Sequence, residues 1–166
     1  MARVVERNGL GPMSATVRVE VEVQAPAEAV WGVISDPGNL PHWNRHIVRV
    51  TGVPSTGLTE GTQYVTEMRF MAVRTRVQAQ VLEWEPPRRA TFRLRGILDA
   101  TVTSTVEPLD DGRSRLEHVV EYRFRGGLVG DLAARSLALV GGDQHALRHG
   151  TLAQKREIEE RTGPGS

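Results

Sequence analysis

The chain of 166 residues contains no cysteine, so disulfides, thiolate nucleophiles and cysteine-ligated metals are excluded. It also lacks any apolar run of the ~18 residues that a membrane-spanning helix requires. The net charge of +1 provides no excess of cations for neutralising phosphates, which argues against a dedicated nucleic-acid-binding protein. The first residues, Met1–Gly9, include charged side chains and no apolar stretch, so we expect no signal peptide and a cytoplasmic location.

Lysine is scarce too. Only Lys155 is a lysine among the 21 basic residues, and we interpret the preference for arginine as the codon bias of a GC-rich bacterial genome. The remaining composition fits one globular domain, because 39% of the residues are hydrophobic and 25% are charged. Residues 1–14 show no apolar period, so we expect them to form a flexible leader. We place a single domain at residues 15–161, with a short tail at residues 162–166.

Alternation of apolar and polar residues predicts an antiparallel sheet. In Thr16–Val23, valines alternate strictly with polar residues, as in a half-buried strand. Further strands are predicted at Ile47–Val53, Thr62–Phe70, Val73–Trp84, Arg89–Arg95, Thr101–Glu107 and Arg115–Phe124. Two short helices, Ala27–Ile34 and Asn39–Trp43, are predicted after the first strand, with Pro26 opening the first of them. Strands followed by one long helix favour the α+β class.

The last long apolar pattern, Leu128–Arg161, has the spacing of an amphipathic helix. We expect its first half to line a space between helix and sheet and its second half to pack as core. The residues expected to line that space are Val129, Leu132, Ser136, Leu139 and Val140. Gly141-Gly142 interrupts the pattern at about 1 kcal/mol per glycine relative to alanine. We therefore predict a kink or a break there, with Asp143 capping a helix that restarts at Gln144.

Several short sequence segments within this order of predicted elements have a recognisable pattern. They are Ala25–Trp31, Asp36–Asn44, Gly61-Thr62, Trp84–Arg89, Val106–Pro108 and Gly112–Leu116. In these segments the chain resembles the helix-grip fold of the START-like superfamily, and more narrowly the bacterial SRPBCC family of polyketide cyclases/dehydrases and lipid-transport proteins. The resemblance covers about residues 16–160.

The resemblance implies a curved antiparallel β-sheet wrapped around a long C-terminal helix, with a mostly apolar cavity between them. Members of the family include aromatases, cyclases, lipid and steroid carriers, and hormone receptors. The implied partner is therefore a hydrophobic or aromatic small molecule, or a polyketide intermediate in secondary metabolism such as antibiotic biosynthesis. The sequence contains no phosphate loop and no dinucleotide fingerprint, so we expect no cofactor, and we expect no metal. The oligomeric state, a homodimer included, is left open.

One face of the last predicted strand carries polar residues among apolar ones. Val120 is expected to face the cavity, and His118 and Tyr122 lie on the same face. His118 could orient a ligand oxygen or act as a general acid/base near neutral pH. The alternative is a core histidine whose ring nitrogens are satisfied by a neighbouring strand or helix. Tyr122 has the same two interpretations, since a buried hydroxyl needs a partner.

A second mixed row runs along the predicted strand Thr62–Phe70. Tyr64, Thr66 and Met68 share one face there and either line a pocket or fill the core. Arg69 belongs to the opposite, convex face unless a β-bulge turns it inward. We expect it to be solvated.

Tryptophans and histidines flank the two short helices. We expect Trp31 to belong to the core and Trp43 to lie at the pocket or its rim, and both are candidates for ligand contact. His42 and His46 have i, i+4 spacing, but no third metal ligand lies near them, so we expect them to be exposed to solvent. A catalytic triad of Ser136, Asp143 and His118 is not expected, because no Gly-x-Ser-x-Gly elbow is present.

Three functional hypotheses follow, in decreasing order of support. The first is a ligand-binding protein that acts as a polyketide cyclase or aromatase by aldol condensation and dehydration. Its catalytic candidates are His118 and Tyr122, with Tyr64 and Thr66 in support. The second is a non-catalytic carrier or sensor of lipids or isoprenoids. The third, a protein-interaction module, ranks last because the convex strand face alternates arginine, glutamine and glutamate where such a module would expose an apolar patch.

Overall fold

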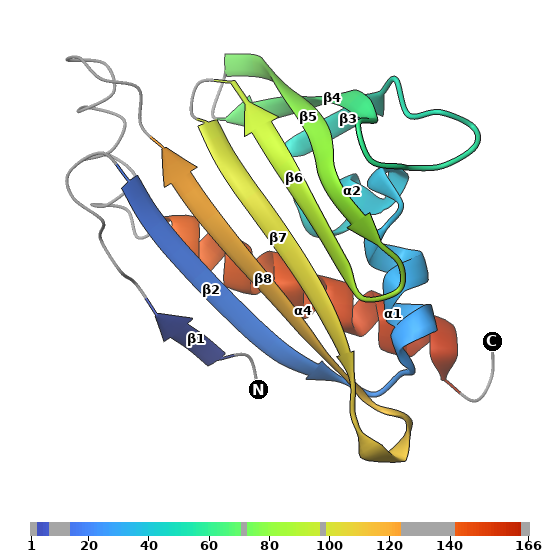
Figure 1. The fold of residues 1–166 in the computed structure, drawn as a ribbon. Helices are drawn as coiled ribbons and strands as arrows, with labels where there is room; N and C mark the ends of the chain where they lie inside the picture. Colours follow the sequence, from blue (N-terminus) through green and yellow to red (C-terminus); the bar gives the residue numbers. More distant parts are fainter. Residues whose placement is uncertain (1–2, 7–13, 71–72, 97–98, 124–141, 164–166) are drawn as a thin grey trace.

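The computed structural model describes residues 3–6, 14–70, 73–96, 99–123 and 142–163, in which eight strands form one sheet (Figure 1). The strands are β1 (Arg3–Glu6), β2 (Ser14–Val23), β3 (Ile47–Thr51), β4 (Gln63–Phe70), β5 (Val73–Glu85), β6 (Arg89–Arg95), β7 (Asp99–Pro108) and β8 (Ser114–Arg123). The helical segments are α1 (Ala27–Ile34), η1 (Pro37–Asn39), α2 (Leu40–Trp43), η2 (Asp110–Gly112) and α4 (Gly142–Thr162).

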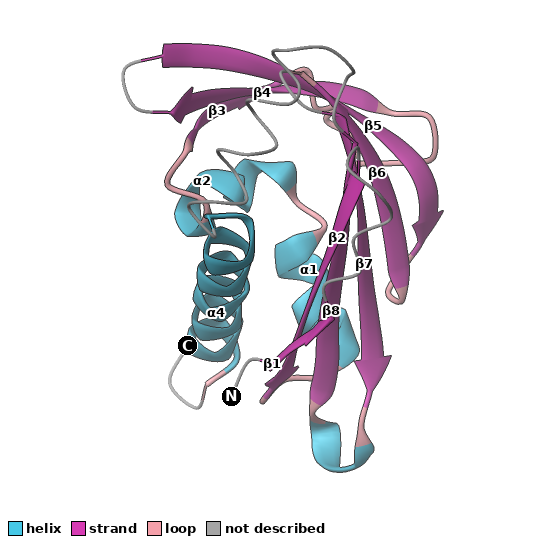
Figure 2. Ribbon diagram, turned by 90° about the vertical axis from the view of Figure 1, so that its left-hand side faces the viewer, coloured by secondary structure: helices cyan, strands magenta, loops and turns pink. Residues whose placement is uncertain are grey.

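The sheet is antiparallel throughout its described pairs, in the order β1-β2-β8-β7-β6-β5-β4-β3. Strands β3 to β8 follow one another as a meander. Strand β2 instead pairs with β8 over ten residue pairs in register. The sheet curves around α4, and α1 and α2 connect β2 to β3 beside the helix (Figure 2). The predicted helix-grip architecture of the α+β class is confirmed.

The alternation in β2 explains its position. Val17, Val19, Val21 and Val23 are at most 1% exposed, whereas the residues between them are half-buried or exposed. One face of β2 therefore lies in the core and the other on the surface of the sheet. The chain then leaves β2 and enters α1 directly after Pro26, as predicted, because a proline at the start of a helix removes no intrahelical hydrogen bond.

Two buried apolar clusters lie on the concave side of the sheet. The first joins β2 and β8 to α1 and α4, with Ile158 of α4 fully buried in it. The second lies between β4, β5 and the loop that precedes β4, and contains Leu58, Tyr64, Ala79 and Val81. Aromatic side chains connect the two clusters. Trp84 packs on Trp31 at 5.2 Å between ring centroids and on Phe92 at 6.4 Å.

The two ends of the chain show where the prediction was incomplete. Strand β1 lies inside the predicted leader, where no strand was expected, and pairs with β2 at the edge of the sheet. Helix α4 is described from Gly142 onwards, so Asp143 lies within the helix and is not the cap of a helix restarting at Gln144. Among the described segments, no helix is long and apolar enough to span a bilayer.

Part of the predicted helix lies outside the described residues. This part is residues 128–141. It contains the predicted lining residues Val129, Leu132, Ser136, Leu139 and Val140, and the N-terminal side of the predicted break at Gly141. These predictions stay predictions.

The packing of α4 generates a stability prediction. Ile158→Ala should lower the free energy of unfolding by about 2–5 kcal/mol, because it removes a fully buried side chain from the cluster that holds α4 to the sheet. Urea unfolding followed by circular dichroism measures the change. The matched control is Arg156→Ala, an exposed position on the same helix, which should change the free energy by about 0.5 kcal/mol or less. Equal losses in both variants would contradict the assigned packing.

Candidate concave ligand face

A row of side chains crosses five strands on the concave face of the sheet. We call it the concave row, and its members are Tyr122, Ala100, Leu94, Ala79 and Tyr64. The register pairs each member with the next across β8, β7, β6, β5 and β4, so all five point to the same side. At about 4.8 Å between neighbouring strands, the two tyrosines lie about 19 Å apart along the sheet. The alanines between them are small and buried, with Ala79 0% and Ala100 6% exposed.

Apolar side chains beside this row are accessible although they face inward. Leu94 of the row is half-buried, and so are Phe92, Val102 and Val77 on neighbouring inward positions. Val120, paired in register with Val102, is 5% exposed and completes this neighbourhood on β8. An inward face that keeps partly accessible apolar surface is a surface on which an apolar molecule can lie.

The two tyrosines give the concave row polar ends. Tyr64 is 6% exposed, and burial raises the pKa of its hydroxyl well above the ordinary value. At neutral pH the hydroxyl therefore stays protonated and can donate a hydrogen bond. Tyr122 is half-buried at the opposite end. Phenol groups at both ends can orient a molecule that carries oxygen atoms at its periphery.

His118 is the next inward-facing residue of β8 after Val120. It lies in a row with Val19 of β2 and Ser104 of β7. It is 5% exposed, and burial lowers the pKa of its imidazole below the ordinary value, which favours the neutral ring. Nε2 lies 2.8 Å from Oε1 of Gln154 on α4, and Nδ1 lies 2.8 Å from Oγ of Ser104. In the neutral ring, Nε2–H donates a hydrogen bond to Oε1 of Gln154, and Nδ1 accepts a hydrogen bond from the hydroxyl of Ser104.

The structure thus gives both ring nitrogens of His118 a protein partner. This is the arrangement described by the core-histidine alternative. The role of His118 as a general acid/base stays a prediction, because it requires one of these partners to give way to a ligand. Sequence reasoning missed Ser104 and Gln154. Ser104 is found only from the register between β7 and β8, which alternation does not determine. The helical spacing of Gln154 with the buried Thr151 and Ile158 could have placed it on the inward face of α4.

The remaining predicted residues lie either on the concave face of β4 or in the core. On β4, Thr66 is 5% exposed and donates from Oγ1 to the carbonyl of Val77 at 3.3 Å, and Met68 is half-buried on the same face. Trp31 is buried in the first cluster as predicted, and Trp43, expected at the pocket or its rim, is buried in that cluster too. Neither tryptophan belongs to the concave row.

The convex side and the short helices hold the other polar candidates. Arg69 is exposed, and β4 keeps an unbroken register with β5, so no bulge in this pairing turns Arg69 inward. His42 is exposed as predicted, and its Nδ1 lies 3.1 Å from Oε1 of Glu157. His46 is half-buried, with Nδ1 3.3 Å from the carbonyl oxygen of Arg69.

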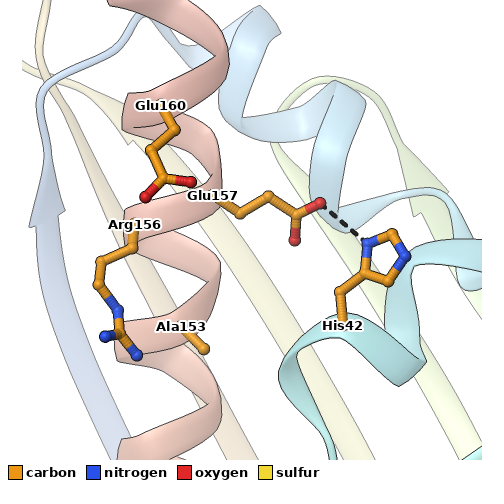
Figure 3. Close-up of a pocket in the computed structure, with 5 residues that line it drawn as sticks. All are labelled: His42, Ala153, Arg156, Glu157 and Glu160. Carbon is orange, nitrogen blue, oxygen red and sulfur yellow. Dashed lines mark hydrogen bonds and ion pairs between the residues drawn. The ribbon is translucent and has the colours of Figure 1, made fainter.

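Two surface pockets flank the short helices. One, of about 410 Å³, lies between α2 and α4 and is lined by His42, Ala153, Arg156, Glu157 and Glu160 (Figure 3). Its charged walls suit a polar occupant. The other, of about 400 Å³, lies beneath the β3–β4 loop and has Val53, Leu58 and Trp84 among its lining residues. Leu58 also belongs to the second cluster, so this pocket lies at the edge of that cluster, and no member of the concave row lines it.

Comparison with known proteins identifies the family. A family model described as "Polyketide cyclase / dehydrase and lipid transport" matches residues 14–148. The chain belongs to this family. A protein of Mycobacterium tuberculosis described as uncharacterized is 31% identical to this polyketide cyclase/dehydrase-family chain over 131 residues, which are 74% of the chain and 88% of that protein.

Solved structures show the same fold at lower identity. The Zhui aromatase/cyclase from a Streptomyces species superposes with a TM-score of 0.76 at 17% identity, covering 92% of this chain and 98% of that chain. A START superfamily protein from Mycobacterium smegmatis gives 0.68 at 19% identity, with 89% and 99% covered. The predicted polyketide cyclase/dehydrase and lipid-transport family is confirmed, and the START-like fold is shared with these structures.

The buried imidazole makes stability depend on pH. Because the folded protein holds the pKa of His118 below its ordinary value of about 6.5, the unfolded chain binds a proton more readily than the folded protein does. The free energy of unfolding should therefore decrease as the pH falls below about 6.5, by at most about 1.4 kcal/mol per pH unit for this group. Urea unfolding at a series of pH values measures this slope.

The slope can be assigned by substitution. His118→Gln keeps a polar side chain but cannot titrate, so this variant should lose the part of the slope that comes from His118. His149→Gln, at an exposed position on α4, is the control and should keep the wild-type slope. An unchanged slope in His118→Gln would show that other groups cause the pH dependence.

Proposed function

We propose that the protein binds an apolar or aromatic small molecule against the concave face of its sheet, over the concave row. The observation that supports this is the partial exposure of Phe92, Leu94, Val77 and Val102, which all face inward. A ligand that covers this surface would stabilise the complex by about 25 cal/mol for each Å² of apolar surface that it removes from water. The polyketide cyclase/dehydrase and lipid transport family of the chain supports the same class of ligand.

The dimensions of the row favour a particular shape of ligand. The concave row runs for about 19 Å along the sheet from one tyrosine to the other, with two small alanines and Leu94 between them. A polycyclic aromatic molecule or an extended acyl or isoprenoid chain fits along such a row, with a polar group near one tyrosine. Binding without chemistry is sufficient for a carrier or sensor, and native mass spectrometry of the purified protein detects a lipid that stays bound in this way.

Bulk added to the concave row tests the binding site. Leu94→Trp adds volume to the middle of the concave row and should weaken binding of an uncharged apolar fluorescent probe, such as Nile red, about tenfold or more. The reason is a steric clash with any molecule lying over the row. Fluorescence titration measures the affinity, and urea unfolding verifies that the variant remains folded.

The matched control introduces the same side chain on the other face. Arg93→Trp changes the adjacent residue of β6, which is exposed on the convex side, and should leave the probe affinity within about twofold of wild type. Wild-type affinity in Leu94→Trp would overturn the proposed binding face.

A second candidate function is cyclisation of a polyketide chain. The structural likeness to an aromatase/cyclase and the position of His118 next to the concave face favour it. Aldol condensation and dehydration move protons at a ketone, which a neutral imidazole with access to the ligand can carry out. For this role the ligand must displace Gln154 or Ser104 from the ring.

Substitution of His118 separates the catalytic role from the structural one. His118→Ala should slow the aldol cyclisation of a linear poly-β-ketone thioester about 100-fold or more, measured by the absorbance of the aromatic product. Ser104→Ala is the control, because it removes one hydrogen bond of the ring and leaves the imidazole in place. A His118→Ala variant that is less stable but fully active would assign the histidine to the core alone.

A further inference from the structure

The convex face of the sheet carries an arginine patch over β3, β4, β5 and β6. Its members are Arg49, Arg69, Arg74, Arg76, Arg93 and Arg95, all exposed. The register places Arg69 opposite Arg74 and Gln78 opposite Arg95, and it aligns Arg49, Glu67 and Arg76 in one row. Partners in register share a face, so these guanidinium groups project to the same side.

The patch has an unbalanced charge. In the described strand pairs, Glu67 is the carboxylate in register with members of the patch, opposite Arg49 and Arg76, and it lies 3.4 Å from Arg76. The other five arginines form no ion pair with a carboxylate in the described part of the chain. Arg69 and Arg74 are moreover directly opposite each other, an arrangement that costs stability because like charges repel across a strand pair.

The other half of the convex face is built differently. There, arginines of β2 and β8 pair with glutamates of neighbouring strands. Arg18 lies 3.0 Å from Glu117, and Arg115 lies 2.8 Å from Glu107. The net charge of +1 therefore conceals a segregation, in which one half of this face is neutralised internally and the other half presents free cations.

We propose that the arginine patch docks the protein onto the anionic surface of a lipid bilayer, where it takes up or delivers the ligand of the concave face. The proposal rests on the proposed function. An apolar ligand dissolves in the bilayer and is scarce in water, so a protein that binds it gains from residence at the membrane surface. Each arginine near an anionic surface strengthens such binding about fivefold.

The composition of the patch favours a membrane over a nucleic acid. The outward positions in register on β4, β5 and β6 carry arginine, glutamine, glutamate, threonine and valine, and no aromatic residue on which a base could stack. At the same edge of the sheet, Val48 of β3 is 48% exposed where a bulge interrupts the pairing with β4. An exposed apolar side chain beside cations suits the boundary between headgroups and acyl chains.

Vesicle co-sedimentation tests the proposal with the full chain. Wild type should bind vesicles of phosphatidylcholine mixed with phosphatidylglycerol, should bind phosphatidylcholine alone weakly, and should dissociate at high salt. Arg69→Gln combined with Arg74→Gln should weaken binding to the anionic vesicles about 30-fold. Arg113→Gln combined with Arg156→Gln removes the same charge elsewhere and should weaken it less than fivefold.

Each outcome supports or overturns the proposal. Equal binding to both vesicle types, equal losses in the two double variants, or preferential binding to an acidic protein or nucleic acid would overturn it. The ligand site is assayed separately. Arg69→Gln with Arg74→Gln should retain wild-type affinity for the apolar probe, whereas Leu94→Trp should retain wild-type vesicle binding. Loss of one property with the other intact identifies which proposal failed.

Discussion

The pairing of β2 with β8 is the constraint on which the rest of the structure depends. It joins the first long strand to the last strand of the meander over ten residue pairs and places Val17, Val19, Val21 and Val23 against the core. Helix α4 packs on this seam, with Ile158 buried beside the valines. Because the helix contacts β2 so closely, the fully buried core gathers at this end of the sheet. The apolar residues farther along the concave face, Phe92 and Leu94 among them, are only half-buried.

His118 lies at the boundary between these two regions. On one side it adjoins Val19 in the core, and on the other it adjoins Ser104 in the direction of the half-buried strands. Its hydrogen bonds to Ser104 and Gln154 each contribute about 0.5–1.5 kcal/mol net, so a ligand that offers an equivalent partner can replace one of them at small cost. A reactive ligand would have to replace the hydrogen bond to Ser104 or the one to Gln154, and the latter joins α4 to the sheet.

The sequence predicted most of the elements and little of the site, for a physical reason. Alternation along one strand determines which residues face inward, and so His118, Tyr122, Tyr64 and Thr66 were placed on the concave face correctly. What alternation cannot determine is register between strands. The meeting of Ser104 with His118, and the alignment of Ala79 and Ala100 between two tyrosines, depend on turns and on the β2–β8 seam. Strand β1 was missed because an edge strand of four residues has too few positions to show a period.

The distribution of charge follows the same division of the sheet. Around the β2–β8 seam the convex face is neutralised by ion pairs such as Arg18 with Glu117, which add little stability on a solvated surface. Over β3 to β6, however, the opposition of Arg69 and Arg74 works against the fold. The half of the sheet that leaves apolar surface accessible on its concave side is thus also the half that presents free guanidinium groups on its convex side. The two proposals are therefore connected through one part of the fold, because the apolar surface for the ligand and the cations for the bilayer lie on opposite faces of the same strands.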